Sequence, residues 1–114
     1  MHEMSIAESI IDIVREEMSR RGIERLETIN LVVGTMSAVV PQHLAFCFEI
    51  VTKDTPLEGT ALRIREVPLT YRCFGCNKEF IAEEMTFVCP DCGEGGLQLI
   101  AGRELAVESL EVSD

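Results

Sequence analysis

Two closely spaced pairs of cysteines carry the clearest chemistry in this sequence of 114 residues. Cys73 and Cys76 form the first pair, and Cys89 and Cys92 form the second. Two residues between cysteines allow both thiolates of one turn to reach the same ion, and two such turns complete a tetrahedral sulfur cage that suits Zn²⁺. A structural site of this kind uses all four positions and leaves none open for a substrate. The spacing therefore predicts a structural four-cysteine zinc site.

Other readings of these cysteines are a redox dithiol, incidental buried cysteines and a rubredoxin-like iron centre, which uses the same ligands. The sequence has no tryptophan and only one tyrosine, Tyr71, and most of the chain would have no role in electron transfer. Zinc is therefore the favoured metal. The fifth cysteine, Cys47, falls within the apolar stripe of an expected helix, where a cysteine packs as a small hydrophobic side chain.

A second set of possible metal ligands opens the sequence as Met1-His2-Glu3. Histidine at the second position places an α-amine, a backbone amide and an imidazole in one chelating unit, which favours square-planar Ni(II) or Cu(II). The amine and the imidazole must both be neutral to bind, so such a site would load near neutral pH and release metal in acid. Taken alone, an N-terminal histidine is more often a solvated residue. The other histidine, His43, is expected to be a surface or capping residue.

The N-terminal half of the sequence predicts two helices and two strands. Ser5 and Glu8 fit a capping box at the start of a helix over about 5–21, and Gly22 follows its last turn. Alternation predicts a strand over 27–33, Pro41 suits the first turn of a helix over about 42–53, and a second strand contains Leu62 and Ile64. The expected apolar face of the first helix consists of Ala7, Ile10, Ile11, Val14 and Met18.

The C-terminal half predicts a metal-organised lobe followed by one strand. Residues from about 71 to 96 hold the cysteine pairs and have too few apolar side chains for a core. In the last strand, over about 104–112, the apolar alternation changes phase near Glu108–Ser109, which suggests a bulge. We therefore expect an α+β fold in which two helices pack on a three-stranded mixed sheet, with an inserted zinc-ribbon lobe. The expected domains are an α/β domain over 1–68 plus 103–114 and a zinc-binding ribbon over 69–102.

Composition excludes several classes of function. The formal net charge is −10 and the sequence pI is about 4.6, so phosphate backbones and anionic membrane surfaces would repel the chain. No secretory signal and no membrane-spanning run is recognisable, and we expect a cytoplasmic protein. The sequence shows no phosphate-binding glycine loop followed by lysine and no Ser/His/Asp set, so no catalytic constellation is predicted.

The combination of these motifs resembles the HypA/HybF family, the nickel metallochaperones of [NiFe]-hydrogenase maturation. The resemblance covers essentially the whole chain. Asn77 departs from the family pattern, in which a glycine commonly follows the first cysteine pair, but asparagine tolerates the same left-handed backbone. Besides the cysteine pairs, the matching segments are Met1-His2-Glu3-Met4-Ser5, Pro41-x-x-Leu44-x-Phe46-x-Phe48-Glu49, Gly102-Arg103-Glu104-Leu105 and Glu108-Ser109-Leu110-Glu111-Val112.

This resemblance implies a carrier of two metals that is not an enzyme. His2, with the Met1 amine and the backbone amides of His2 and Glu3, would bind Ni²⁺ as cargo in the α/β domain. The four cysteines of the lobe would bind structural Zn²⁺. The implied partners are the GTPase HypB and the hydrogenase large-subunit precursor, and in some bacteria urease maturation proteins. The competing hypotheses are a zinc-ribbon adaptor between proteins, without a second metal, and a rubredoxin-like electron carrier.

Overall fold

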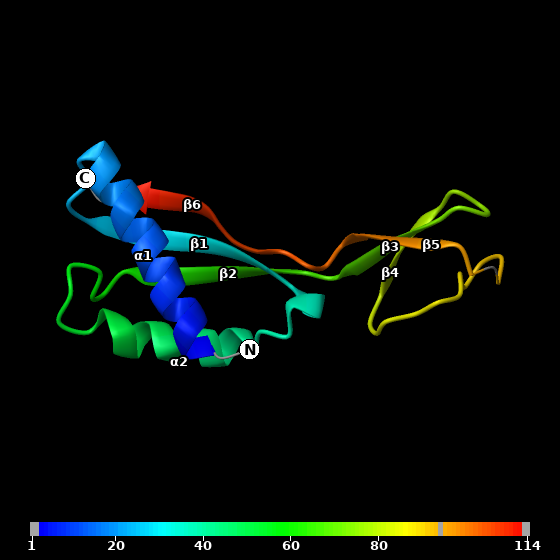
Figure 1. The fold of residues 1–114 in the computed structure, drawn as a ribbon, viewed down its shortest axis with the longest axis horizontal. Coiled ribbons are helices and arrows are strands. Elements are labelled where there is room, and N and C mark those ends of the chain that lie inside the picture. The colour runs from blue at the N-terminus through cyan, green and yellow to red at the C-terminus, as the bar shows by residue number, and fades with distance from the viewer. Residues whose placement is uncertain (1–2, 94, 113–114) are drawn as a thin grey trace. The chain divides into compact units, whose positions relative to one another are not determined.

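The chain divides into two compact units, which are described separately. The computed structural model describes residues 3–93 and 95–112 (Figure 1). The first unit, called here the α/β unit, comprises Met1–Val32, Val39–Arg65 and Ala106–Asp114. The second, called the cysteine lobe, comprises Val33–Ala38 and Glu66–Leu105. Each unit is built around its own three-stranded sheet.

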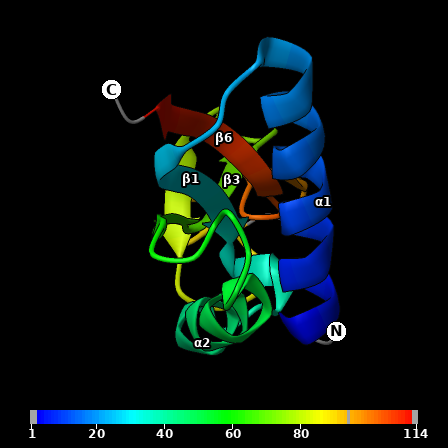
Figure 2. The ribbon, with the colours of Figure 1, turned by 90° about the vertical axis from the view of Figure 1, so that its left-hand side faces the viewer.

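The α/β unit consists of two helices and a sheet with the strand order β2-β1-β6. β1 and β2 run in the same direction and β6 runs in the opposite one, so the sheet is mixed (Figure 1). The N-terminal half of α1 lies beside α2 (Figure 2). The predicted fold class is thereby confirmed. The elements are α1 (Glu3–Arg21), β1 (Leu26–Gly34), a 3-10 turn (Thr35–Ser37), α2 (Pro41–Thr52), β2 (Ala61–Val67) and β6 (Leu105–Val112).

Helix α1 buries the face that its periodicity predicts. All five expected apolar residues are buried, and Gly22 has the left-handed φ of 67° that ends such a helix. The helix begins at Glu3, two residues earlier than expected, so Ser5 lies inside the first turn. The predicted capping box at Ser5 is therefore wrong. This helix of 19 residues supplies much of the apolar side of the unit.

Helix α2 differs from its predicted apolar stripe. Leu44, Phe48 and Thr52 are buried, whereas Cys47 is only half-buried. Thr52 can be buried because its hydroxyl donates a 2.7 Å hydrogen bond to the Phe48 carbonyl. His43 is exposed and does not cap the helix, which begins with Pro41 at its first turn. Cys47 is thus a peripheral packing residue rather than a core one.

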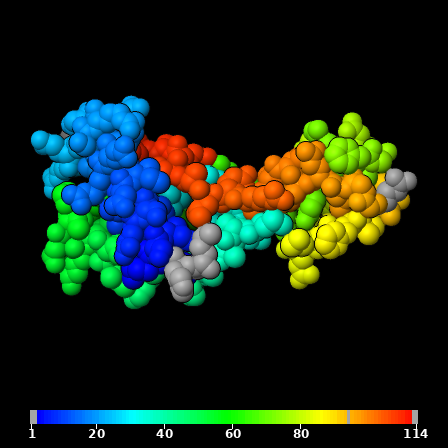
Figure 3. All heavy atoms as spheres, viewed as in Figure 1, coloured from blue at the N-terminus to red at the C-terminus, as the bar shows by residue number. Residues whose placement is uncertain are grey.

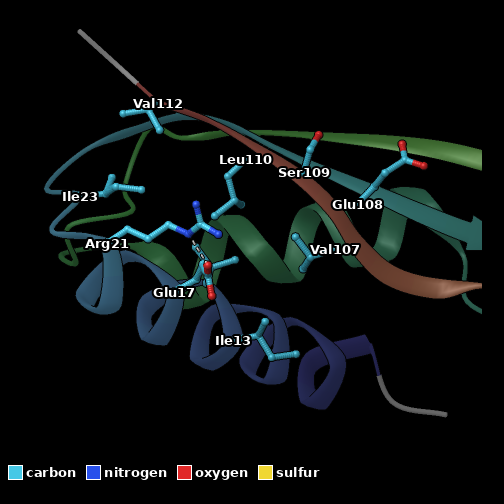
Figure 4. Close-up of a pocket in the computed structure, with 10 residues that line it drawn as sticks. Ile13, Glu17, Arg21, Ile23, Val107, Glu108, Ser109, Leu110 and Val112 are labelled. Atoms are coloured by element: carbon cyan, nitrogen blue, oxygen red, sulfur yellow. Dashed lines mark hydrogen bonds and ion pairs between the residues drawn. The ribbon is translucent and has the colours of Figure 1, made fainter.

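Strand β6 contains the predicted change of phase. Val107 and Leu110 are both half-buried and point toward α1, while Glu108 and Ser109 between them point away (Figure 4). On that outer face Asn30 donates hydrogen bonds to the Ser109 hydroxyl and the Glu111 carboxylate, at 3.1 and 3.0 Å. A hydrogen bond from Arg65 lowers the pKa of Glu108 from its usual value. The open face of the sheet is therefore polar, and the apolar residues of β6 form one wall of a groove of about 430 Å³ against α1.

The cysteine lobe contains a small antiparallel sheet, in line with the predicted ribbon, although the bounds of its strands were not predicted. Its strands are β3 (Leu69–Cys73), β4 (Glu79–Ala82) and β5 (Leu97–Ala101), in the order β4-β3-β5. Tyr71 on β3 lies opposite Phe80 on the neighbouring strand β4, and the two rings stack with centroids 5.6 Å apart. The buried residues of β3 alternate as Leu69, Tyr71 and Cys73. Few other side chains of the lobe are buried, so its apolar core is small.

Two glycines of the lobe approach each other too closely to admit a side chain. A Cβ added to Gly34 would lie 2.2 Å from both the carbonyl carbon and the oxygen of Gly102. This contact is held by a hydrogen bond of 2.6 Å from the Gly34 amide to the Glu104 carbonyl and one of 2.7 Å from the Met36 amide to the Gly102 carbonyl. The obstruction is backbone, which cannot rotate away.

We expect Gly34→Ala to destabilise the protein by at least about 2 kcal/mol, because the strands must separate to admit the methyl group. The backbone of Gly34 is extended, with φ −82°, so alanine is not strained there in itself. Urea unfolding followed by circular dichroism measures the change. The matched control is Gly96→Ala, where the added Cβ would have its nearest contact at an ordinary 3.7 Å. Equal midpoints for the two variants would contradict the steric explanation.

Candidate metal centre

The four cysteines of the two predicted pairs converge on one point of the lobe. Their sulfur atoms all lie within 4.8 Å of one another. The Cys73 and Cys92 sulfurs are 3.5 Å apart, and those of Cys76 and Cys89 are 3.8 Å apart. These separations are too long for disulfides, whose sulfurs lie about 2 Å apart. Four sulfurs at zinc–sulfur distances of about 2.3 Å on a regular tetrahedron would be separated by about 3.8 Å. The donor set therefore fits a zinc ion.

The same backbone turn presents each pair of cysteines. The Asn77 amide donates a 2.7 Å hydrogen bond to the Cys73 carbonyl, and the Gly93 amide donates one of 2.9 Å to the Cys89 carbonyl. Asn77 and Gly93 both have left-handed backbones, with φ of 61° and 73°. The chain thus reverses immediately after the second cysteine of each pair. Asparagine adopts at the first turn the left-handed conformation that glycine adopts at the second, as expected for a short side chain that tolerates this conformation.

Backbone amides favour thiolates at this centre. Hydrogen bonds from the backbone of Cys92 and then Asp91 lower the pKa of Cys89 to about 7, although burial opposes the shift. At Cys76 the backbone of Lys78 also favours the thiolate, but burial and the neighbouring Cys73 and Cys89 sulfurs outweigh it and raise the pKa. Four sulfurs this close cannot all be anionic at low cost without a cation between them. A divalent cation bound between the four sulfurs would therefore stabilise this arrangement.

Access to the four sulfurs is uneven. Cys73 and Cys89 are buried, Cys76 is half-buried and Cys92 is exposed. The two basic residues beside the first pair are engaged elsewhere: Arg72 binds Glu79 at 2.7 Å and Lys78 approaches Asp91 at 3.6 Å. Within residues 3–93 and 95–112, no other group of three or more His, Cys, Asp or Glu side chains is gathered to hold a metal ion.

The second predicted site lies almost entirely outside the described residues. This applies to Met1 and His2. Glu3 is the first residue of α1, and its side chain is half-buried. The stacked pair of Tyr71 and Phe80 beside the cysteine centre was not predicted from the sequence, where Tyr71 served only as an argument against iron. The signal was present in the alternation of Leu69, Tyr71 and Cys73, which continues a strand into the first metal-binding turn.

Comparison with known proteins decides the family. A family model described as hydrogenase/urease nickel incorporation, metallochaperone, hypA, matches residues 1–112. The chain belongs to the HypA family. Two relatives, each called hydrogenase maturation factor HypA, come from Desulfatibacillum aliphaticivorans and Geobacter metallireducens. The first is 44% identical over 100% of this chain and 88% of its own length, and the second is 42% identical over 98% and 99%.

Solved structures of the HypA family share this fold. A solution structure of the Ni metallochaperone HypA from Helicobacter pylori matches with a TM-score of 0.66 and 24% identity, covering 98% of this chain and 97% of that one. A second solution structure of a HypA protein matches with a TM-score of 0.72 and 23% identity, over 99% and 97%. HypA proteins are metallochaperones, so the chain is not an enzyme. No helix among the described residues is both long and apolar enough to cross a bilayer.

Proposed function

We propose that this protein carries Ni(II) to [NiFe]-hydrogenase during maturation, with nickel bound at the N-terminus and a structural zinc ion in the cysteine lobe. The observation that carries the proposal is the HypA family match, which extends from residue 1 to residue 112 and includes both Met1-His2-Glu3 and the two cysteine pairs. The convergence of the four sulfurs supports the zinc assignment.

The N-terminal tripeptide offers a complete nitrogen donor set for nickel. The Met1 amine, the backbone amides of His2 and Glu3, and the His2 imidazole together form fused chelate rings, which suit square-planar Ni(II). Ligands at a chain terminus can be exchanged one at a time by an approaching acceptor, so the same site can bind firmly and release. Both the amine and the imidazole must lose their protons, which makes acid a release condition.

Zinc has the opposite task in this proposal. The four thiolates of Cys73, Cys76, Cys89 and Cys92 fill a tetrahedral coordination sphere and leave no position for exchange with a substrate. The ion replaces the apolar core that the lobe lacks, because few of the side chains in the lobe are buried. Zinc therefore stabilises structure while nickel is transported.

The partners in this proposal are the GTPase HypB and the hydrogenase large-subunit precursor. The family description also names urease, and delivery to urease maturation proteins is included in the proposal. A formal net charge of −10 favours docking to basic protein surfaces. Reduced thiolates of this kind persist in a reducing compartment, so we place the protein in the cytoplasm.

Metal analysis of untagged protein separates this function from its competitors. Elemental analysis of protein purified after growth with nickel, zinc and iron is expected to find one zinc per chain and nickel that binds in addition. Zinc without any nickel binding would leave a zinc-ribbon adaptor between proteins as the function. Iron with visible absorption would identify an electron carrier.

An N-terminal extension is expected to remove nickel binding, because it converts the Met1 amine into a peptide amide that no longer provides the same donor. Calorimetric titration with Ni(II) would compare a short N-terminal extension with the same extension at the C-terminus. Zinc content should be one per chain in both. Equal nickel affinity of the two forms would exclude the N-terminal chelate.

A further inference from the structure

The cysteine lobe exposes large apolar side chains close to the metal-binding turns. Phe74 is 68% exposed, Met85 61%, Phe87 75% and Val88 53%. We call these four residues the aromatic patch. Figure 3 shows the segment around residues 80–90, in yellow, at the surface of the lobe. Single exposed apolar residues are ordinary in proteins, but several large ones within four consecutive positions indicate a binding surface.

Two glycines leave the aromatic residues of the patch uncovered. The Phe74 amide donates a 2.8 Å hydrogen bond to the Gly96 carbonyl, and a Cβ on Gly96 would lie 3.7 Å from the Cβ of Phe74. The Phe87 carbonyl oxygen lies 3.3 Å from the position of a Cβ on Gly95. Because Gly95 and Gly96 are adjacent, Phe74 and Phe87 flank the same two residues. Neither glycine has a side chain that would shield the rings from solvent.

The segment that presents the patch is anchored at Thr86, between Met85 and Phe87. The Thr86 amide donates a 3.4 Å hydrogen bond to the hydroxyl of Tyr71, which is buried in the lobe sheet. The Thr86 hydroxyl forms hydrogen bonds with the backbone of Val88, at 3.3 and 3.4 Å. Thr86 itself is half-buried, whereas its two neighbours are exposed. The apolar side chains are thus held outward by a fixed backbone, which lowers the entropic cost of binding.

Charges around the patch are predominantly negative. Glu83 and Glu84 immediately precede Met85, are exposed, and form no ion pair with any residue in 3–93 or 95–112. Arg72 and Lys78, which could offset them, are already paired with Glu79 and Asp91. Four thiolates with one Zn²⁺ add a charge of −2 by count. A partner that covers the patch must therefore supply positive charge.

We infer that the aromatic patch is a docking surface for a protein partner in nickel delivery, whose own face carries Lys and Arg side chains around an apolar pocket. The inference rests on the proposed function for the identity of that partner. A second copy of this chain fits poorly, because it would place two acidic lobes together. Met85 and Phe87 enter the pocket of the partner, Glu83 and Glu84 pair with its basic rim, and Tyr71 keeps the segment in place.

The test measures binding of full-length, zinc-loaded protein to two purified probes, the GTPase HypB and the hydrogenase large-subunit precursor. Biolayer interferometry at low and at physiological salt gives affinities and rates. The double variant M85S/F87S is expected to weaken binding to at least one probe by about 30-fold or more, as central apolar anchors do. The double variant E83Q/E84Q is expected to lower the association rate several-fold and to flatten its salt dependence.

Tyr71→Phe tests the anchor, because it removes only the hydroxyl that Thr86 contacts. We expect binding several-fold weaker, with zinc content and the circular dichroism of the lobe unchanged. The matched control is Ile100→Ser, which removes an exposed apolar side chain from β5 of the same lobe but outside the patch. Should M85S/F87S disturb zinc binding, the single variants Met85→Ser and Tyr71→Phe replace it in the same binding measurement.

Each outcome bears on a different claim. Loss of binding in the patch variants, with Ile100→Ser unaffected, supports the inference. Wild-type affinity of M85S/F87S for both probes, or an equal loss in Ile100→Ser, overturns the docking surface and leaves nickel delivery standing. Failure of both probes to bind the wild type overturns the proposed partners and, with them, this inference. Loss of concentration-dependent dimers in M85S/F87S, by sedimentation, would assign the patch to self-association and overturn the inference too.

Discussion

Replacement of His2 with alanine is expected to abolish high-affinity nickel binding while leaving the fold and the zinc ion intact. The imidazole is the one side-chain donor of the proposed chelate, and its loss leaves an amine and amides that cannot complete a square plane. Changes in the surroundings of metal ligands alone typically lower affinity by 10–100-fold, so loss of the ligand itself should lower it by at least about 100-fold. Calorimetric titration of Ni(II) into untagged, zinc-loaded protein measures the effect.

His43→Ala is the matched control for that experiment. His43 is the other histidine of the chain, and it lies exposed on α2 without capping the helix. The His43→Ala protein is expected to bind nickel with the affinity of the wild type. Retention of one tightly bound nickel by His2→Ala would refute the N-terminal site, and a loss confined to His43→Ala would move the site to α2.

Replacement of Cys73 with serine is expected to release zinc and to unfold the cysteine lobe. Cys73 is buried at the end of β3, in the turn that begins the metal centre. Structural zinc sites contribute apparent binding free energies of about 10–16 kcal/mol, which in such small units is also folding free energy. The lobe has few buried apolar side chains to replace that contribution. Two-dimensional amide NMR spectra should show the resonances of the lobe collapse into the random-coil region.

The α/β unit should keep its native spectrum in that variant. Its core is independent of the metal and includes Ile29, Leu31 and Leu44, all fully buried. Cys47→Ser is the matched cysteine control, because Cys47 is half-buried on α2 and outside the metal centre. It should retain one zinc per chain. A Cys73→Ser protein with a dispersed lobe spectrum and no zinc would show that the lobe folds by hydrophobic burial alone.

The helices and the sheet of the α/β unit could be predicted because their apolar periodicities are long and regular. Every expected buried residue of α1 is buried. Side chains at the edge of the pattern were predicted less well. Thr28 lies on the polar side of the alternation over 27–33 but is buried, in β1, the central strand of its sheet. Local alternation cannot reveal how many neighbours a strand will have.

The lobe was predictable in its chemistry and as a ribbon, but not in the bounds and pairing of its strands. Spacing alone identified the four cysteines that the structure brings together. The bounds of β3, β4 and β5 were not predicted because each strand has only four or five residues, too few for a clear alternation. Their pairing depends on contacts between distant parts of the chain, such as Arg72 with Gln98. The early start of α1 at Glu3 also lay outside the periodic signal, which begins further along.

The place of the lobe between β2 and β6 sets an order of events during synthesis. A ribosome makes β3, β4 and β5 before β6, so the lobe can collect zinc while β1 still lacks its second neighbour. Until β6 arrives, one edge of β1 offers unpaired amides and carbonyls to any passing strand. A nascent chain stalled or cleaved before Leu105 would therefore be prone to aggregate even with its metal centre complete. Synthesis of β6 therefore protects the new chain from aggregation, because β6 pairs with the exposed edge of β1.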